Sequence, residues 1–170
     1  IYDKKGQNVV SLDLRPISSA IADYFVIASA KNDNQISINT TLEVDLTGQC
    51  ASESIGSRQY SGSGGQADTA IGAQNSKNGM SIIALYSTAM VKNKETGEKE
   101  EISKIVPQLQ AGAAVTLSRN DVDRVVTEYG VAELRGTNIR ERVERLIAIA
   151  HPKFREELQR QAVEVGILGK

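Results

Sequence analysis

The hydrophobic pattern of this chain changes once, near residue 138, and that change restricts the fold more than any single motif. Before it, apolar residues form short runs or alternate with polar ones, which is typical of β-strands. After it, they recur at helical spacing over 139–150 and 154–165. Many short strands followed by two helices favour an α/β layer structure. The predicted strands are 9–14, 24–27 (or a short helix here), 36–39, 42–46, 81–86, 105–107, 114–117 and 125–129.

Local signals refine this outline. Asn138 and Glu141 have the spacing of a capping box, so the first terminal helix is expected to begin there. The charged residues of that helix, Arg142 among them, are expected to form a solvated face. Residues 92–104 hold four Lys and four Glu around a glycine and predict a solvated hairpin or loop. Residues 31–34 predict a turn.

Composition excludes several classes of protein. The chain has 170 residues, which are enough for one domain with a hydrophobic core. Its charges are balanced, with 20 Lys and Arg against 21 Asp and Glu, so no basic face for nucleic acid is expected. No apolar run approaches the roughly 18–20 residues of a membrane span. Cys50 is the single cysteine, so no intrachain disulfide is expected and a reducing cytoplasm is the simplest compartment. We expect Cys50 to be an inert apolar residue.

A glycine-rich loop, Gly62-Ser63-Gly64-Gly65, is the most informative local feature. Successive amides in such a loop can point into one concavity that attracts an anion or a developing oxyanion, and a short helix predicted over 67–73 would add to the field. A tight strand-to-helix turn without a ligand is the alternative. A loose dinucleotide fingerprint also fits, but the preceding residues 57–61 are too polar for a buried strand.

Other polar residues have both functional and structural interpretations. His151 lies between the two helices, where capping or packing explains it, and one His with one Cys gives no metal-ligand cluster. Glu128 ends a strand, either as a functional group at a ligand crevice or as a structural hydrogen-bond acceptor. Glu43 and Asp45 share one strand face, either as an acid/base pair or as a solvated or hydrogen-bonded edge.

A second acidic group follows in the chain. Arg119, Asp121 and Asp123 predict a surface ion-pair cluster.

Six ordered blocks of this sequence resemble one known family, the acetyl-CoA hydrolase/transferase family, in its C-terminal domain. The resemblance covers about residues 35–166, and we interpret 1–170 as a fragment of that domain. The blocks are 37–49, 61–68, 81–85, 103–107, 125–132 and 147–155.

The resemblance implies a three-layer α/β/α open sheet, CoA-transferase-like (NagB/RpiA-like), as one half of a two-domain enzyme. The family transfers CoA between an acyl-CoA and a small carboxylate through an active-site glutamate that lies upstream of these blocks. The fragment alone is therefore expected to be inactive, with its own N-terminal domain as partner. The resemblance also allows a homodimer, and implies no permanently bound cofactor, no metal, no membrane and no nucleic acid.

By the same resemblance, the amide of Gly64 or Gly65 faces the thioester oxygen as half of an oxyanion hole. Gln66 and Asp68 shape the loop, and 104–106 borders the CoA groove. Asp68-Thr69-Ala70 departs from the 4-hydroxybutyrate type and favours the butyryl-CoA:acetate type. A hydrolase of the same family and a non-catalytic nucleotide- or CoA-binding module remain the alternatives. The expected catalytic and CoA-binding residues are Gly62, Gly64, Gly65, Gln66, Asp68, Lys104, Ile105 and Val106.

Overall fold

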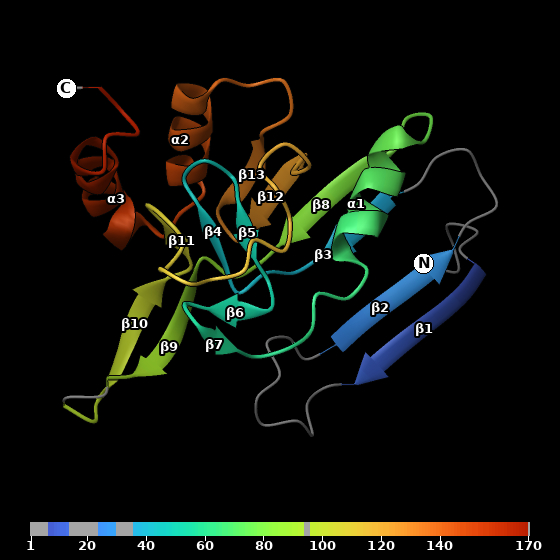
Figure 1. The fold of residues 1–170 in the computed structure, drawn as a ribbon, viewed down its shortest axis with the longest axis horizontal. Coiled ribbons are helices and arrows are strands. Elements are labelled where there is room, and N and C mark those ends of the chain that lie inside the picture. Colours follow the sequence, from blue (N-terminus) through green and yellow to red (C-terminus); the bar gives the residue numbers. More distant parts are fainter. Residues whose placement is uncertain (1–6, 14–23, 30–35, 94–95, 170) are drawn as a thin grey trace.

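The structure is a computed structural model that describes residues 7–13, 24–29, 36–93 and 96–169 (Figure 1). Its class is mixed α/β, as predicted, and 24–27 belongs to a strand. The predicted turn at 31–34 lies outside the described residues. In chain order the elements are β1 (Gln7–Asp13), β2 (Tyr24–Ser29), β3 (Ile36–Asn39), β4 (Glu43–Asp45), β5 (Cys50–Ala51), β6 (Ser54–Ile55), β7 (Arg58–Gln59), α1 (Gln66–Asn75), β8 (Met80–Ala84), β9 (Thr88–Lys92), β10 (Lys99–Ser103), β11 (Ile105–Val106), β12 (Arg124–Thr127), β13 (Gly130–Glu133), α2 (Ile139–Ala148) and α3 (Pro152–Glu164).

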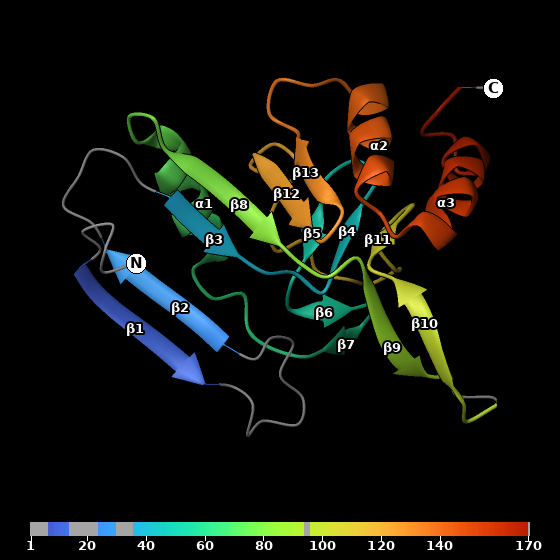
Figure 2. The ribbon, with the colours of Figure 1, turned by 180° about the vertical axis from the view of Figure 1, so that it is seen from behind.

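The largest sheet has the order β13-β12-β8-β3. Strands β3, β8 and β12 run parallel, so their carboxyl ends meet at one edge, as the arrows in Figure 2 show. The chain then turns between Thr127 and Gly130, where φ of +142° suits glycine, and returns as the antiparallel strand β13. The sequence predicted the end of β12 at this turn but not β13. Helix α1 packs on β3 and β8.

A second sheet, β11-β4-β5, lies in the middle of the core. All three residues of β4 are buried, including Glu43 and Asp45, so the prediction of a half-buried strand is wrong for its polar face. The reason is position: β4 is the central strand, covered on both sides. The predicted strand at 114–117 is also wrong, because only one bridge forms there, between Leu117 and Cys50.

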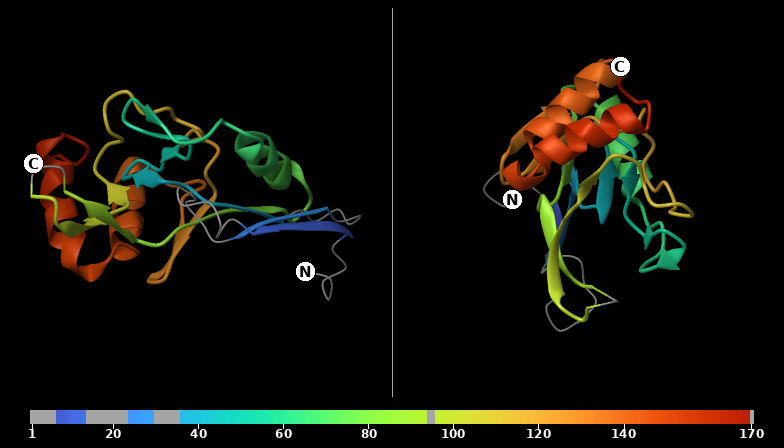
Figure 3. Two further views of the ribbon diagram at one scale, coloured as in Figure 1. Left: turned by 90° about the horizontal axis from the view of Figure 1, so that it is seen from below. Right: turned by 90° about the vertical axis from the view of Figure 1, so that its left-hand side faces the viewer.

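The terminal helices agree with their sequence signals. The Asn138 side chain accepts from the Glu141 amide at 3.0 Å, and the Glu141 carboxylate accepts from the Asn138 amide at 2.8 Å, which completes the capping box. Helix α2 packs on β13 and on α3. Strands β9 and β10 pair antiparallel where a solvated hairpin or loop was predicted over 92–104, and they extend from the body of the molecule (Figure 3).

The prediction that Arg142 lies on a solvated face of α2 is wrong, because this residue is only 8% exposed. Its guanidinium donates to the carbonyl oxygens of Arg119 at 2.7 Å, Thr47 at 3.0 Å and Thr137 at 3.4 Å. Burial lowers the pKa of Arg142, and the nearby charge of Arg119 lowers it further. The side chain therefore joins α2 to two loops of the core instead of meeting solvent.

Candidate functional site

The glycine loop is held at both ends by hydrogen bonds. On its amino-terminal side, the amides of Tyr60 and Ser61 donate to the Glu53 carbonyl at 2.7 and 3.1 Å. On its carboxyl-terminal side, the buried Gln66 amide group donates to the Thr40 carbonyl at 3.3 Å. The loop therefore has a defined path from β7 to α1, beside the carboxyl end of β3.

The middle of the loop leaves its backbone open. Gly64 has φ of +55°, and Gly65 precedes α1 with φ of −99° and no side-chain cap. Among the described residues, no protein group accepts a hydrogen bond from the amide of Gly64 or Gly65. A Cβ built on either glycine, or on Gly62, meets no atom within 4 Å. Open amides at the start of a helix can bind an anion or a developing negative charge.

Polar groups from three parallel strands gather at the same edge of the large sheet. Thr40 follows β3, Ser87 follows β8 and Glu128 follows β12. The carboxyl ends of parallel strands are where ligands bind in open α/β sheets. The glycine loop is linked to this edge by the hydrogen bond from Gln66 to the Thr40 carbonyl, at the end of β3.

Glu128 is fixed there by Ser87. Its carboxylate accepts from the Ser87 hydroxyl at 2.6 Å and from the Ser87 amide at 2.9 Å. Burial by itself would raise the pKa of Glu128, but these hydrogen bonds and the nearby His151 lower it below its ordinary value. Glu128 is therefore a carboxylate at neutral pH. The hydrogen-bonded interpretation of this residue is confirmed.

Lys104 belongs to the same neighbourhood. Its amide donates to the Ser87 carbonyl at 2.8 Å, which brings the start of β11 to the end of β8. Burial lowers the pKa of Lys104, and the negative charge of Glu128 offsets part of that effect. The next residue, Ile105, is completely buried in the core, while Val106 is half-buried. Of 104–106, Lys104 is thus the residue with a polar side chain near this edge.

Sequence reasoning missed Ser87 and left Glu128 undecided. The one available signal was a polar residue directly after the apolar run 81–86. That signal does not show that Ser87 and Glu128, 41 positions apart, meet at one sheet edge. Asp68, which was expected to shape the loop, is exposed in the first turn of α1, where its charge suits the helix dipole.

The acidic residues of β4 have structural partners. Asp45 accepts four hydrogen bonds from Thr47 and Gln49, between 2.7 and 3.0 Å, and so organises its own turn. Glu43 accepts from the Gln110 amide at 3.3 Å, and burial raises its pKa. The pair is hydrogen-bonded but not solvated.

Two further candidates also have structural roles. Burial raises the pKa of the Cys50 thiol, consistent with an inert residue. His151 caps α3 by accepting from the Lys153 amide at 3.2 Å, as predicted.

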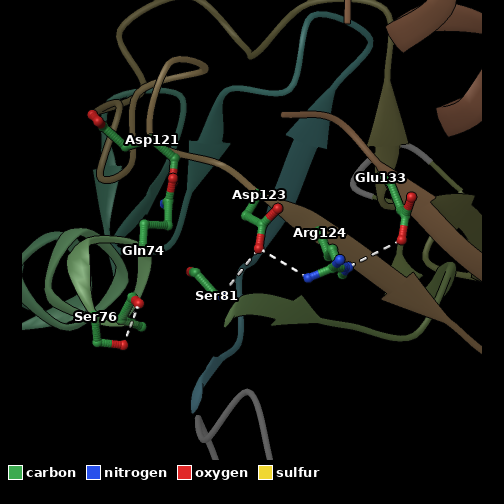
Figure 4. Close-up of polar contacts among 8 residues, drawn as sticks. Gln74, Ser76, Ser81, Asp121, Asp123, Arg124 and Glu133 are labelled. Carbon is green, nitrogen blue, oxygen red and sulfur yellow. Dashed lines mark hydrogen bonds and ion pairs between the residues drawn. The ribbon is translucent and has the colours of Figure 1, made fainter. Parts of the chain in front are cut away.

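The predicted surface cluster of Arg119, Asp121 and Asp123 does not form among the described residues. Asp123 is buried, accepts from the Ser81 amide at 3.2 Å and pairs with Arg124 at 3.1 Å (Figure 4). The carbonyl of Arg119 instead binds Arg142. The sequence places these charges close together along the chain, but the strand β12 that begins at Arg124 turns Asp123 inward.

No group of three or more His, Cys, Asp or Glu side chains in the described segments is arranged to hold a metal ion. No helix within the described part of the chain is long and apolar enough to cross a membrane.

A sheet with three parallel strands, and a glycine loop that enters a helix at their carboxyl edge, defines the molecule as a mixed α/β domain. The model of the acetyl-CoA hydrolase/transferase C-terminal domain matches residues 7–162. The chain belongs to this family.

Individual relatives agree with this assignment. The chain is 56% identical over 131 residues to the 4-hydroxybutyrate coenzyme A transferase of Clostridium kluyveri, covering 77% of this chain and 29% of that protein. It is 44% identical over 135 residues to the butyryl-CoA:acetate CoA-transferase of Anaerostipes caccae, covering 79% and 29%. The crystal structure of RipA from Yersinia pestis superposes with a TM-score of 0.66 at 44% identity, covering 78% and 28%. The chain thus spans less than a third of the length of these relatives.

Proposed function

We propose that this chain is the C-terminal part of an acyl-CoA:carboxylate CoA-transferase, called here the full-length enzyme. The observation that carries the proposal is the open amide pair of Gly64 and Gly65 at the carboxyl edge of the parallel strands. Charge grows on the thioester oxygen during acyl transfer, and a preorganised N–H contributes about 3–4 kcal/mol to its stabilisation. The loop therefore supplies half of an oxyanion hole.

The attacking group in this proposal is a glutamate outside the 170 residues, because Glu43, Glu53 and Glu128 do not lie in the motif that the family resemblance implies. Its carboxylate attacks the thioester carbon, the C–S bond breaks, and CoA leaves as a thiolate from an acyl-glutamyl anhydride. The thiolate then attacks the glutamyl carbonyl, which releases the carboxylate product and forms a glutamyl-CoA thioester. An acceptor carboxylate reverses these two steps.

The remaining parts of the proposal concern the surroundings of the loop. Lys104 and Val106 border the CoA groove, since Lys104 lies beside Ser87 and Glu128. The full-length enzyme has a three-layer α/β/α arrangement in this half and pairs it with its own N-terminal domain. It acts in the cytoplasm, can form a homodimer, and needs no permanently bound cofactor.

The proposal gives the acyl group only as a class and does not choose one substrate. The departure at Asp68-Thr69-Ala70 favoured the butyryl-CoA:acetate type, yet the identity is higher with the 4-hydroxybutyrate enzyme of Clostridium kluyveri than with the butyryl-CoA:acetate enzyme of Anaerostipes caccae. We therefore propose a short-chain acyl-CoA as donor, with either relative's substrate as a starting point for assays.

The test is acceptor dependence in the full-length enzyme. Thioester loss from butyryl-CoA and 4-hydroxybutyryl-CoA is followed with and without acetate, and formation of acetyl-CoA is measured by chromatography. A transferase consumes the donor only with acetate and yields one acetyl-CoA for each donor consumed. Equal loss without acetate would identify the second candidate, a hydrolase, which the family description also includes.

A further inference from the structure

The amino-terminal side of the glycine loop is held through one residue, Glu53. Its main-chain carbonyl accepts from the amides of Tyr60 at 2.7 Å and Ser61 at 3.1 Å. A second connection uses Gln59, whose side chain donates to the Ser61 carbonyl at 2.6 Å and to the Glu53 carboxylate at 3.4 Å. Both connections at this end of the loop therefore lead to Glu53.

The Glu53 carboxylate is in turn fixed to the core. Its second oxygen accepts from the Thr116 hydroxyl at 3.1 Å, and the same hydroxyl accepts from the Ser52 amide at 3.0 Å. The amide of Thr116 donates to the carbonyl of Cys50 at 2.9 Å, and Cys50 is completely buried. The half-buried side chain of Glu53 thus connects the buried segment around Cys50 with the exposed loop.

The glycines between the two ends of the loop lie in open space. The chain runs from β7 to α1 without a helix or strand (Figure 1). Residues 62–65 include three glycines, and a Cβ built on any of them meets no atom within 4 Å. Glycine restricts the backbone less than any other residue. The direction of the Gly64 and Gly65 amides is therefore set by the two ends of the loop, at Gln66 and at 60–61.

We infer that Glu53 is a positioning residue for this loop. Its carboxylate holds Gln59 and Thr116, so that the amides of Gly64 and Gly65 keep one direction. The inference rests on the proposed function in taking these amides as half of an oxyanion hole. Donors in such a site must be preorganised, and a displacement of about 1 Å can lower the rate by about 10²-fold.

Geometry and charge predict opposite effects for one substitution. Glu53→Gln keeps the shape of the side chain but replaces one acceptor oxygen with an NH₂ group, so Thr116 and Gln59 no longer each face an oxygen. The substitution also removes a negative charge near the loop, which by itself would favour a developing oxyanion. A fall in kcat would therefore report lost positioning, whereas a rise would report the charge.

The test is a kinetic double-mutant cycle in the full-length enzyme. We expect Glu53→Gln to lower kcat for CoA transfer from butyryl-CoA to acetate by about 10-fold and to leave KM for butyryl-CoA within about 2-fold, because the loop amides act in the transition state. In the background of Gly65→Ala, Glu53→Gln should lower kcat no further, because the amide that it positions is already obstructed. The matched control is Glu156→Gln, at an exposed position of α3, which should retain kcat in both backgrounds.

Amide hydrogen exchange is a second measurement, and it does not depend on activity. Glu53→Gln should increase the exchange rates of the Tyr60 and Ser61 amides by about 10-fold, because their acceptor carbonyl is held less firmly, while the amides of α3 stay unchanged. Gln59→Met, at an exposed residue of β7, removes the side-chain connection to Ser61. It repeats both measurements, with the same expected direction, if Glu53→Gln does not fold.

Three outcomes would overturn the inference. The first is a kcat that is unchanged or raised in Glu53→Gln. The second is a pair of effects, of Glu53→Gln and Gly65→Ala, that multiply to about 10³-fold, since the two residues would then act independently. The third is unchanged exchange at 60–61.

The cycle also separates this inference from the proposed function. If Gly65→Ala alone leaves kcat unchanged, the oxyanion role fails and the positioning role fails with it. If Gly65→Ala lowers kcat and Glu53→Gln does not, only the role of Glu53 fails.

Discussion

Gly64 and Gly65 are neighbours, but they differ in what a methyl group would do to them. Gly64 has φ of +55°, where an alanine costs about 1–2 kcal/mol in backbone strain. Gly65 has φ of −99°, which alanine adopts freely, and neither position has an atom within 4 Å of an added Cβ. Gly65→Ala is therefore the cleaner probe of the proposed oxyanion site, since it leaves the fold unstrained.

We predict that Gly65→Ala lowers kcat of the full-length enzyme by about 10²-fold, because the methyl group displaces the acyl oxygen from the amide. The melting temperature should stay within about 1 °C of the parent. Gly169→Ala is the matched control, since it lies outside the loop and its added Cβ also meets open space, and it should retain kcat. Loss of activity in both variants, or in neither, would remove the specific role of the amide pair.

Ser87 gives a second prediction, on pH dependence. The folded pKa of Glu128 lies below its ordinary value of 4.5, so this carboxylate contributes stability above that pH and loses it as pH falls through the folded pKa. Ser87→Ala removes the 2.6 Å hydrogen bond. The loss of this bond should lower the free energy of unfolding at pH 7 by about 1 kcal/mol. The effect is no larger because Glu128 is largely solvated. The difference should shrink as pH falls below 4.5.

The measurement is urea denaturation of the full-length enzyme between pH 7 and pH 3.5. Its control is Ser87→Ala in the background of Glu128→Gln, which has no charge to titrate, so that the double-mutant cycle isolates the pair. A Ser87→Ala effect that is constant with pH in both backgrounds would show that the hydroxyl stabilises something other than the ionised carboxylate.

At the scale of elements, Arg142 joins α2 to the turn after β4 and to the loop before β12. Replacing it with Met keeps much of the volume but leaves the carbonyls of Thr47, Arg119 and Thr137 without this donor. Methionine avoids the cost of burying a guanidinium, but the loss of three hydrogen bonds is larger than this gain. Arg142→Met should therefore lower the free energy of unfolding by about 2–3 kcal/mol. Arg140→Met, at an exposed position of the same helix, should change it by less than about 0.5 kcal/mol.

Urea denaturation of both variants checks this prediction. If Arg142→Met were as stable as the parent, the three hydrogen bonds would contribute nothing beyond the cost of burying the guanidinium.

Arg142 also shows where prediction from sequence ends. Helices α2 and α3, their caps and the α/β class follow from local patterns, because capping and helical periodicity depend on residues three or four positions apart. The burial of Arg142, Asp123 and the polar residues of β4 depends on which strand becomes central and which loop lies above a helix. The central strand and the position of the loops are set by contacts between segments far apart in the chain, such as the contact of Thr47 with Arg142. Strand β13 was not predicted, because the glycine at position 130 indicated only where the strand before it ends.

At the scale of the whole molecule, the candidate site combines segments that local patterns cannot bring together. The glycine loop was found from its composition, whereas the Ser87–Glu128 pair and its approach to Lys104 depend on the parallel order of β3, β8 and β12. In this arrangement the chain supplies the loop amides and the Ser87–Glu128 pair, and the proposed nucleophile comes from outside the 170 residues.

The last prediction follows from that arrangement. The 170-residue chain alone should transfer no CoA from butyryl-CoA to acetate, and should bind CoA with Kd in about the millimolar range, because a few amides without the opposite wall give little binding energy. Calorimetric titration with CoA, after circular dichroism has verified the fold, measures the affinity against the full-length enzyme. A Kd below about 1 µM would instead identify an autonomous CoA-binding module, since only a complete site exceeds the entropy cost of holding such a flexible ligand.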